Sequence, residues 1–297
     1  MEDKKPFVSI IIPAYNEELF IENTIDGLEK ISTIDEIIIV DDGSSDNTVE
    51  IVERKINEEK SKKIKKNLLG KTYESIEKNF SEKEILSENQ KENSSKKAIL
   101  DENQKGCFSK KADFEFEGRI KLVKISKNSG KGHALNCGLK EAYKKSDVIG
   151  FIDGDLGKSS SETKKLIEPI LNGEADVTIA GFPKATKKGG FGFVKRLAYN
   201  SVFEMTGTEV LASLSGQRIF KREVLEKFEE IPFGYGVEVG MTIDILKLGY
   251  KIKEVPVNMT HNETGRNLKG FIHRGKQYYH IKKIVSQKKK QYKFDNK

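Results

Sequence analysis

Two aspartates separated by one glycine, Asp153 and Asp155, directly follow the apolar run 148–152. A short apolar run that ends in turn residues predicts a buried strand of a parallel sheet, and open α/β sheets place their ligands just beyond the carboxyl ends of such strands. Two carboxylates this close repel each other unless a cation lies between them, and oxygen ligands suit Mg²⁺ or Mn²⁺. The pair therefore predicts a divalent metal site, although a simple turn also uses Asp and Gly.

A second chemical feature is Lys131, which lies between Gly130 and Gly132 where a helix is predicted to begin. Glycines let the backbone approach a ligand, the free N–H groups of a helix start attract anions, and the lysine adds a full positive charge. The segment is not a Walker A loop, because Gly132 stands where Ser or Thr is required. We expect an anion contact here, with a structural turn as the alternative.

The elements that would position these residues form a parallel α/β pattern. Each apolar strand ends in a polar turn, and apolar residues at helical spacing follow, as in Ile21, Ile25 and Leu28 after the first strand. Strand, turn and helix in repeated order predict a mostly parallel sheet flanked by helices. The predicted strands cover residues 7–12, 36–40, 119–125, 148–152, 175–181 and 252–257.

The composition favours some classes of protein function and argues against others. The chain has 297 residues, is 36% hydrophobic and 33% charged, and carries a net charge of +7, which suits an anionic ligand. A nucleic-acid partner is not expected, because no stacking aromatics are interleaved with the basic residues. No apolar run is long enough to cross a bilayer, and the first residues lack the apolar stretch of a signal peptide. We therefore expect a cytoplasmic protein.

Two segments depart from the α/β pattern. Residues from about 57 to 117 are dense in Lys, Glu, Ser and Asn without a sustained period, which predicts a solvated, low-complexity insertion and leaves open whether it is partly helical or disordered. Residues 282–297 form a strongly basic, weakly amphipathic tail. Such a tail would favour peripheral contact with the acidic inner face of a membrane.

Four motifs lie at strand ends, and in chain order they are Pro-Ala-Tyr-Asn-Glu at 13–17, Val-Asp-Asp-Gly-Ser-Ser-Asp at 40–46, Asn-Ser-Gly-Lys-Gly at 128–132 and Asp-Gly-Asp at 153–155. In this order they resemble the motifs of the family 2 glycosyltransferases. The resemblance implies a GT-A fold, which is a Rossmann-like α/β fold with a mostly parallel central sheet, and the use of a nucleotide-diphosphate sugar with Mg²⁺ or Mn²⁺. It covers residues 1–281 apart from the insertion at about 57–117, with a nucleotide-binding half at about 1–157 and an acceptor half at about 158–281.

The resemblance also implies roles on the donor side, residue by residue. A divalent cation next to Asp155 would stabilise the negative charge that grows on the departing nucleoside diphosphate, and Lys131 would add to that effect. The implied contacts are Pro13, Ala14, Tyr15 and Glu17 with the nucleoside, Asp42 with the base or ribose, Lys131 with the base or diphosphate, Asp153 with ribose or metal, and Asp155 and His261 with the metal.

On the acceptor side, residues 235–240 and the pair at 261–262 are similar to those of glucosyl-3-phosphoglycerate synthases. Glu238 is the predicted base or acceptor-positioning residue, while the segment 214–218 departs from the Gly-Glu-Tyr version found in that group. Arg218 could clamp a phosphate or carboxylate, with a structural ion pair as the alternative. The predicted acceptor residues are Gly189, Gly190, Gln217, Arg218 and Tyr235.

These inferences predict a metal-dependent glycosyltransferase that moves a sugar from a UDP-sugar, or less favourably a GDP-sugar, to a hydroxyl or phosphate acceptor. Two acceptor classes remain open: a small anionic metabolite such as 3-phosphoglycerate, and a polyprenyl phosphate or cell-envelope glycan at the membrane face. The alternative of another class is a non-catalytic nucleotide-sugar-binding protein. The sequence is compatible with a homodimer and with a cytoplasmic location, free or peripheral at the inner membrane face.

Overall fold

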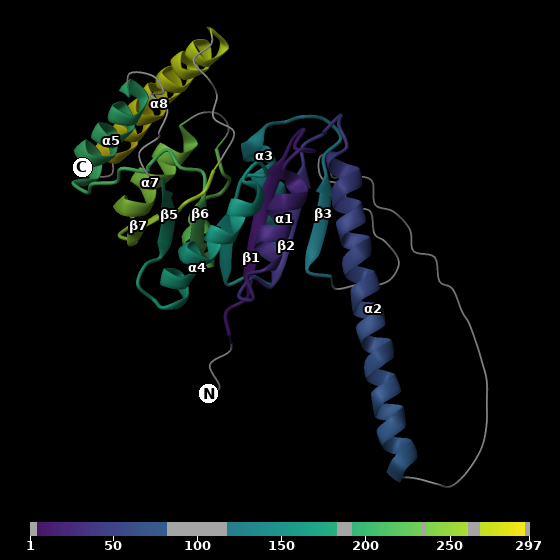
Figure 1. Cartoon of the computed structure of the whole chain (residues 1–297). Helices are drawn as coiled ribbons and strands as arrows, with labels where there is room; N and C mark the ends of the chain where they lie inside the picture. Colours follow the sequence, from purple (N-terminus) through teal and green to yellow (C-terminus); the bar gives the residue numbers. More distant parts are fainter. Residues whose placement is uncertain (1–4, 82–117, 183–191, 233–235, 261–267, 295–297) are drawn as a thin grey trace, which may run out of the picture.

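The computed structural model of the chain contains one seven-stranded sheet with helices on both faces (Figure 1). This architecture is the α/β fold with a mostly parallel central sheet that the sequence predicts. The structure describes residues 5–81, 118–182, 192–232, 236–260 and 268–294.

The strand order is β3-β2-β1-β4-β6-β5-β7. All neighbouring pairs are parallel except those of β6, which runs antiparallel to both β4 and β5. The carboxyl ends of β1, β2 and β4 therefore meet at one edge of the sheet. The strands are β1 (Val8–Ala14), β2 (Glu36–Asp41), β3 (Ile120–Lys124), β4 (Val148–Phe151), β5 (Val177–Gly181), β6 (Arg218–Lys221) and β7 (Ile252–Pro256).

Side chains that alternate along each strand supply two hydrophobic cores, one on each face of the sheet. Ile11 of β1 belongs to the core beneath α3, α5, α7 and α8, whereas Ile10 and Ile12 belong to the core beneath α1 and α4. The helices are α1 (Ile21–Glu29), α2 (Thr48–Ser81), α3 (Lys131–Ala142), the 3₁₀ helix η1 (Gly157–Glu162), α4 (Thr163–Leu171), α5 (Phe193–Thr206), α6 (Arg222–Leu225), α7 (Val237–Lys247) and α8 (Leu268–Phe294).

The first part of the predicted insertion, residues 57–81, is helical, because α2 continues from Thr48 to Ser81 without a break. Lys and Glu favour helix even where no apolar period marks a buried face, so the charged run extends the helix. Figure 1 shows α2 projecting away from the rest of the molecule. The remainder of the predicted insertion, residues 82–117, lies outside the described residues.

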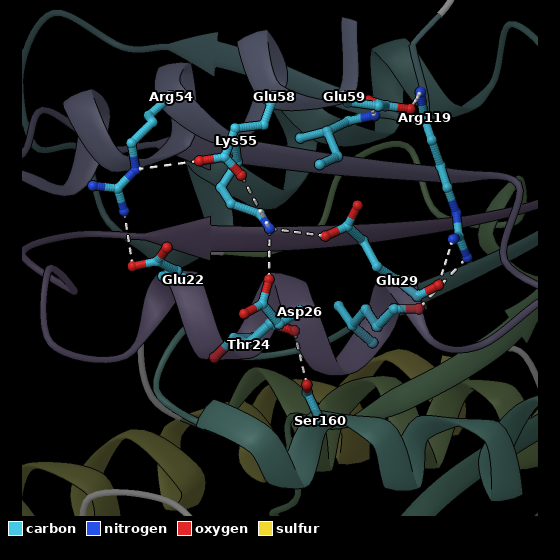
Figure 2. Close-up of polar contacts among 12 residues, drawn as sticks. Glu22, Thr24, Asp26, Glu29, Arg54, Lys55, Glu58, Glu59, Arg119 and Ser160 are labelled. Atoms are coloured by element: carbon cyan, nitrogen blue, oxygen red, sulfur yellow. Dashed lines mark hydrogen bonds and ion pairs between the residues drawn. The ribbon is translucent and has the colours of Figure 1, made fainter. Parts of the chain in front are cut away.

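The base of α2 is held by a cluster of charges around Lys55 (Figure 2). Lys55 Nζ lies 2.5 Å from Asp26 Oδ1 and 3.0 Å from Glu29 Oε2, although only 6% of the residue is exposed. Arg119, immediately before β3, donates to the Glu29 carbonyl oxygen at 2.7 Å, and its backbone N–H donates to Glu59 Oε1 at 2.7 Å. These contacts fix the first turns of α2 against α1 and β3.

The predicted boundary between the GT-A domain and the basic tail, at residues 281 and 282, falls inside α8. Ile281 and Val285 of this helix are 0% and 7% exposed and belong to the core beneath α7. The basic segment is therefore part of a docked helix. Within the described ranges, no helix is long and apolar enough to cross a bilayer.

Candidate active site

The carboxyl edge of the sheet brings four predicted site residues together. Glu17 follows β1, Asp42 follows β2, and Asp153 and Asp155 follow β4. The parallel pairing of β1 with β2 and with β4 places these three strand ends side by side. Lys131, the first residue of α3, reaches the same edge.

Asp153 is held by two partners. Its carboxylate oxygen Oδ1 lies 2.5 Å from Lys131 Nζ, and Oδ2 accepts a hydrogen bond of 2.6 Å from Gln217 Nε2. The Gln217 side chain also accepts the backbone N–H of Asp153 at 2.9 Å, and Gln217 is only 3% exposed. A Cβ atom on Gly216 would come within 2.7 Å of Lys131 Nζ, so a glycine leaves room for this ion pair. The arrangement orients Asp153 and keeps one positive charge at the site.

Lys131 lies in an electric field that favours its charged form. Burial by itself lowers the pKa of an ammonium group, but the carboxylates of Asp153, Glu238 and Asp155 outweigh this effect, so the pKa of Lys131 is raised. The lysine therefore stays positive at neutral pH, as an anion contact requires.

Asp42 anchors the loop that leads into α3. Its two carboxylate oxygens accept the backbone N–H groups of Ser129 and Gly130 at 2.8 and 2.7 Å, and the residue is 3% exposed. Gly130 has a φ of 93°, a region that L side chains rarely adopt. Asp42 thus fixes the backbone that presents Lys131, and its contact with a base or ribose stays a prediction.

Glu17 shares the acidic end of the site with the two aspartates. Its side chain lies against Gly154, where an added Cβ would be 3.2 Å from Glu17 Cγ. Burial and the charges of Asp155 and Asp153 raise the pKa of Glu17 to about 7. Burial is the larger cause, and the part that comes from Asp155 and Asp153 reflects neighbouring negative charges that a cation would neutralise.

Replacing Glu17 by glutamine should therefore stabilise the protein at high pH. The pKa of Glu17 in the folded state lies above the ordinary 4.5. The folded state therefore binds this proton more tightly than the unfolded state does, and the free energy of unfolding falls as the pH rises from about 4.5 through about 7. We expect Glu17→Gln to exceed wild type by about 1–3 kcal/mol in free energy of unfolding at pH 8 and to match it near pH 4. Urea titrations at both pH values measure this, and an equal difference at both would contradict it.

Asp155 lines an open pocket of about 560 Å³. Thr260, the last described residue before His261, lines the same pocket, and its backbone N–H donates to Ser159 Oγ at 3.0 Å. The pocket is lined by Phe20, Asn23, Asp155, Leu156, Gly157, Lys158, Ser159 and Thr260. The chain after β7 is therefore anchored beside Asp155 immediately before His261, which itself lies outside the described residues.

Thr24 of α1 is a positioning residue that the sequence analysis missed. Its hydroxyl donates to the Gly154 carbonyl oxygen at 2.7 Å and accepts the Gly157 backbone N–H at 2.8 Å, so it fixes the turn that carries Asp155. Ser160 Oγ donates in turn to the Thr24 carbonyl oxygen at 2.8 Å (Figure 2). The available signal was a threonine on the apolar face of a predicted helix.

The donor set suits a hard divalent cation. Asp153 and Asp155 supply carboxylate oxygens, and Mg²⁺ usually takes one or two protein carboxylates and completes its shell with water and phosphate oxygens. In the part of the chain that the structure describes, no group of three or more His, Cys, Asp or Glu residues is arranged to hold a metal ion. The described residues thus fit a metal site that would take its remaining ligands from water and from the phosphate oxygens of a ligand.

The comparison with known proteins decides the family. The chain matches the profile of "Glycosyl transferase family 2" over residues 9–71 and 63–247. The chain belongs to this family. It is therefore a glycosyltransferase, as the strand-end motifs predict.

Two relatives and one solved structure give the family context. A UDP-N-acetylglucosamine–dolichyl-phosphate N-acetylglucosaminyltransferase of Methanococcus voltae is 30% identical over 241 residues, covering 77% of this chain and 74% of the relative. The glucosyl-3-phosphoglycerate synthase of Mycobacterium tuberculosis is 25% identical over 253 residues, 80% of this chain but only 60% of that protein. Its structure with Mn²⁺, UDP and phosphoglyceric acid has a TM-score of 0.59 at 22% identity, covering 94% of this chain and 77% of that one. This likeness confirms the GT-A fold.

The sequence analysis assigns Arg218 to the acceptor site of this glycosyltransferase, but the structure gives it a different role. Arg218 is 1% exposed, and its guanidinium donates to the carbonyl oxygens of Ser215 and Ser213 at 2.8 Å and to Thr242 Oγ1 at 3.1 Å. Burial lowers its pKa to about 10, an effect that the negative charge of Glu238 opposes. This arrangement supports the structural alternative, because the guanidinium binds the protein itself and is withdrawn from solvent.

Glu238 lies in the first turn of α7, after Gly236 at the N-cap. Its negative charge acts to raise the pKa of both Lys131 and Arg218, which places Glu238 in the neighbourhood of these two residues. Its role as base or acceptor-positioning group stays a prediction of the glycosyltransferase mechanism.

The remaining predicted residues divide into two groups. Pro13 and Ala14 end β1, and Tyr15 follows them with 46% of its surface exposed at the sheet edge, where a nucleoside could stack. The second group lies outside the described residues and consists of Gly189, Gly190, Tyr235 and His261.

Proposed function

We propose that the chain transfers a sugar from a UDP-sugar to the phosphate of a polyprenyl phosphate in a reaction that needs Mg²⁺ or Mn²⁺. The observation that carries the donor side is the Lys131–Asp153–Gln217 network beside Asp155 at the carboxyl edge of the sheet. The Methanococcus voltae relative is named for a UDP-sugar donor and a dolichyl-phosphate acceptor, and the Mycobacterium tuberculosis synthase binds UDP with Mn²⁺.

The donor would bind with its diphosphate between Lys131 and Asp155. Lewis-acid stabilisation of the charge that grows on the departing diphosphate is the chemistry that a bound Mg²⁺ or Mn²⁺ supplies there. Lys131 adds its positive charge on the other side, and Asp42 holds the backbone that presents it. Gln217 keeps Asp153 oriented toward the ribose or the metal.

The two acceptor classes differ in whether they need Glu238 as a base. A hydroxyl acceptor must lose a proton as it attacks, and a carboxylate such as Glu238 is the kind of group that takes it. A phosphate acceptor is already ionised at neutral pH and needs no base, so Glu238 would only position it. Arg218 is buried and its guanidinium binds the protein itself, so this residue does not offer a forked clamp to a small acid.

A small anionic acceptor is the second candidate, because the Mycobacterium tuberculosis synthase binds phosphoglyceric acid and resembles this chain over most of its length. Gly189, Gly190 and Tyr235 are the residues we assign to that acceptor. The alternative of a non-catalytic nucleotide-sugar-binding protein predicts UDP binding without product.

A partition assay tests the proposal. Protein, Mn²⁺ and labelled UDP-N-acetylglucosamine or UDP-glucose are incubated with dolichyl phosphate in detergent or with 3-phosphoglycerate. We expect label to enter the organic phase with the lipid acceptor and EDTA to abolish the transfer. Label in an anionic aqueous product would select phosphoglycerate instead. No transfer from any UDP- or GDP-sugar to either acceptor would contradict the proposal.

A further inference from the structure

The helix α8 has an unusual charge composition. Its 27 residues, Leu268–Phe294, contain eight lysines and one arginine but neither Asp nor Glu. Mixed charges are the rule on a solvated helix, and α2 of this chain shows them. A helix with basic residues alone presents a surface that favours an anionic partner.

The inner face of α8 is fixed to the protein. Ile281 lies against Gly236 at the N-cap of α7, and Ile284 lies against Gly240 within α7; an added Cβ at either glycine would approach these side chains to 2.9 Å. Further along, Asp244 of α7 lies 2.6 Å from Lys288 Nζ and accepts the Tyr292 hydroxyl at 2.8 Å. The helix is therefore a rigid part of the catalytic domain, and its outer face has a fixed orientation.

The outer face combines basic and aromatic side chains. Lys276, Lys282, Lys283 and Lys290 are exposed, and Tyr279 is 66% exposed. Lysines with long apolar stems and tyrosines with one polar end suit the headgroup region of a bilayer, where both kinds of surface are satisfied.

The neighbouring helix α5 extends this face. Lys289 of α8 forms an ion pair with Glu204 near the end of α5 at 2.7 Å, and the two helices pack side by side in Figure 1. At the start of α5, Phe193 is 55% exposed and Arg196 is exposed beside it, with its guanidinium 5.5 Å from the Phe193 ring centre. An exposed aromatic next to a basic residue continues the pattern of α8.

We propose that the outer face of α8, together with the start of α5, docks on an anionic lipid bilayer. This inference rests on the proposed function, for which it supplies the surface that presents a lipid-phosphate acceptor. Positive charges near an anionic bilayer each strengthen binding, and exposed aromatics add an interfacial contact. Figure 1 places α2 at the other end of the molecule, so the projecting helix does not obstruct this face.

The docked face is connected to the site through α7. Gly236, Gly240 and Asp244 recur every four residues and form the ridge that contacts α8. Thr242, on the other side of α7, accepts the Arg218 guanidinium, and its own hydroxyl donates to the Glu238 carbonyl oxygen at 2.7 Å. A bilayer against α8 would thus lie at a fixed position relative to Glu238, on the acceptor half of the protein.

Flotation with vesicles tests the docking. The full chain is mixed with vesicles of phosphatidylcholine containing phosphatidylglycerol, or of phosphatidylcholine alone. We expect wild type to float with the anionic vesicles at low salt, and Lys282→Glu/Lys283→Glu to lower the bound fraction by about tenfold or more. The matched control, Lys62→Glu/Lys63→Glu on α2, makes the same change in net charge and should float as wild type does. Tyr279→Ala should weaken binding with no change in charge.

The outcomes distinguish a failure of the docking surface from a failure of the proposed function. Absence of wild-type flotation, or equal losses in the α8 and α2 variants, would overturn the docking surface even if sugar transfer in detergent succeeds. Asp155→Ala should float normally, because flotation requires no turnover. Normal flotation together with failed sugar transfer would instead contradict the proposed reaction and support the docking surface.

Discussion

Asp155→Ala should lower kcat for sugar transfer by roughly 10²–10³-fold, the loss seen when one strong electrostatic contact to a transition state is removed. Asp155 lines the pocket beside the Thr260 segment, and its charge is among those that raise the pKa of Glu17. Without it, the site loses the carboxylate best placed for a divalent cation, and the departing diphosphate is less stabilised. Initial rates of UDP release with saturating Mn²⁺ measure the effect.

The control for this variant is Glu168→Ala, which also removes one carboxylate but from the exposed face of α4, where Glu168 pairs only loosely with Lys164 at 3.7 Å. It should retain wild-type turnover. If Asp155→Ala kept both its rate and its dependence on Mn²⁺, the assignment of Asp155 as the metal ligand would be wrong.

Arg218→Met should destabilise the fold by about 3–5 kcal/mol, since removing a buried charged donor leaves several partners unsatisfied. The carbonyl oxygens of Ser213 and Ser215 would lose their donors in the interior, and Thr242 would lose one of its two contacts. Urea denaturation followed by circular dichroism measures the change.

Arg222→Met is the matched control, because the Arg222 side chain on α6 is 38% exposed and pairs with Glu226 at 2.6 Å. Surface pairs contribute about 1 kcal/mol or less, so this variant should remain near wild-type stability. An Arg218→Met protein of unchanged stability but with weakened acceptor binding would restore the acceptor clamp that the sequence suggested.

The fold and the donor edge could be predicted from the sequence because their signals are local. Apolar strands followed by polar turns indicate a parallel sheet, and the ends of such strands share one edge. This placed Glu17, Asp42, Lys131 and Asp153 near one another without any knowledge of the strand order. The resemblance to the family 2 glycosyltransferases rests on the same strand-end motifs, and the match to the family profile confirmed this resemblance.

The features that the sequence did not predict depend on tertiary contacts. Arg218 looks like an anion clamp in the sequence, yet its guanidinium bonds to residues 213, 215 and 242, which only the fold brings around it. The basic segment after residue 281 looked like a tail because Lys is frequent there, whereas Gly236 and Gly240 far upstream provide its docking site. The predicted roles of Tyr235 and His261 remain predictions.

The central claim is that this edge of the sheet binds a nucleoside diphosphate through a divalent cation at Asp155. Titration calorimetry of UDP into the protein tests it most directly. The account predicts saturable binding in the presence of Mn²⁺ that is lost in EDTA and strongly weakened in Asp155→Ala at the same Mn²⁺ concentration. Equal affinity for UDP with Mn²⁺, with EDTA and in Asp155→Ala would contradict it.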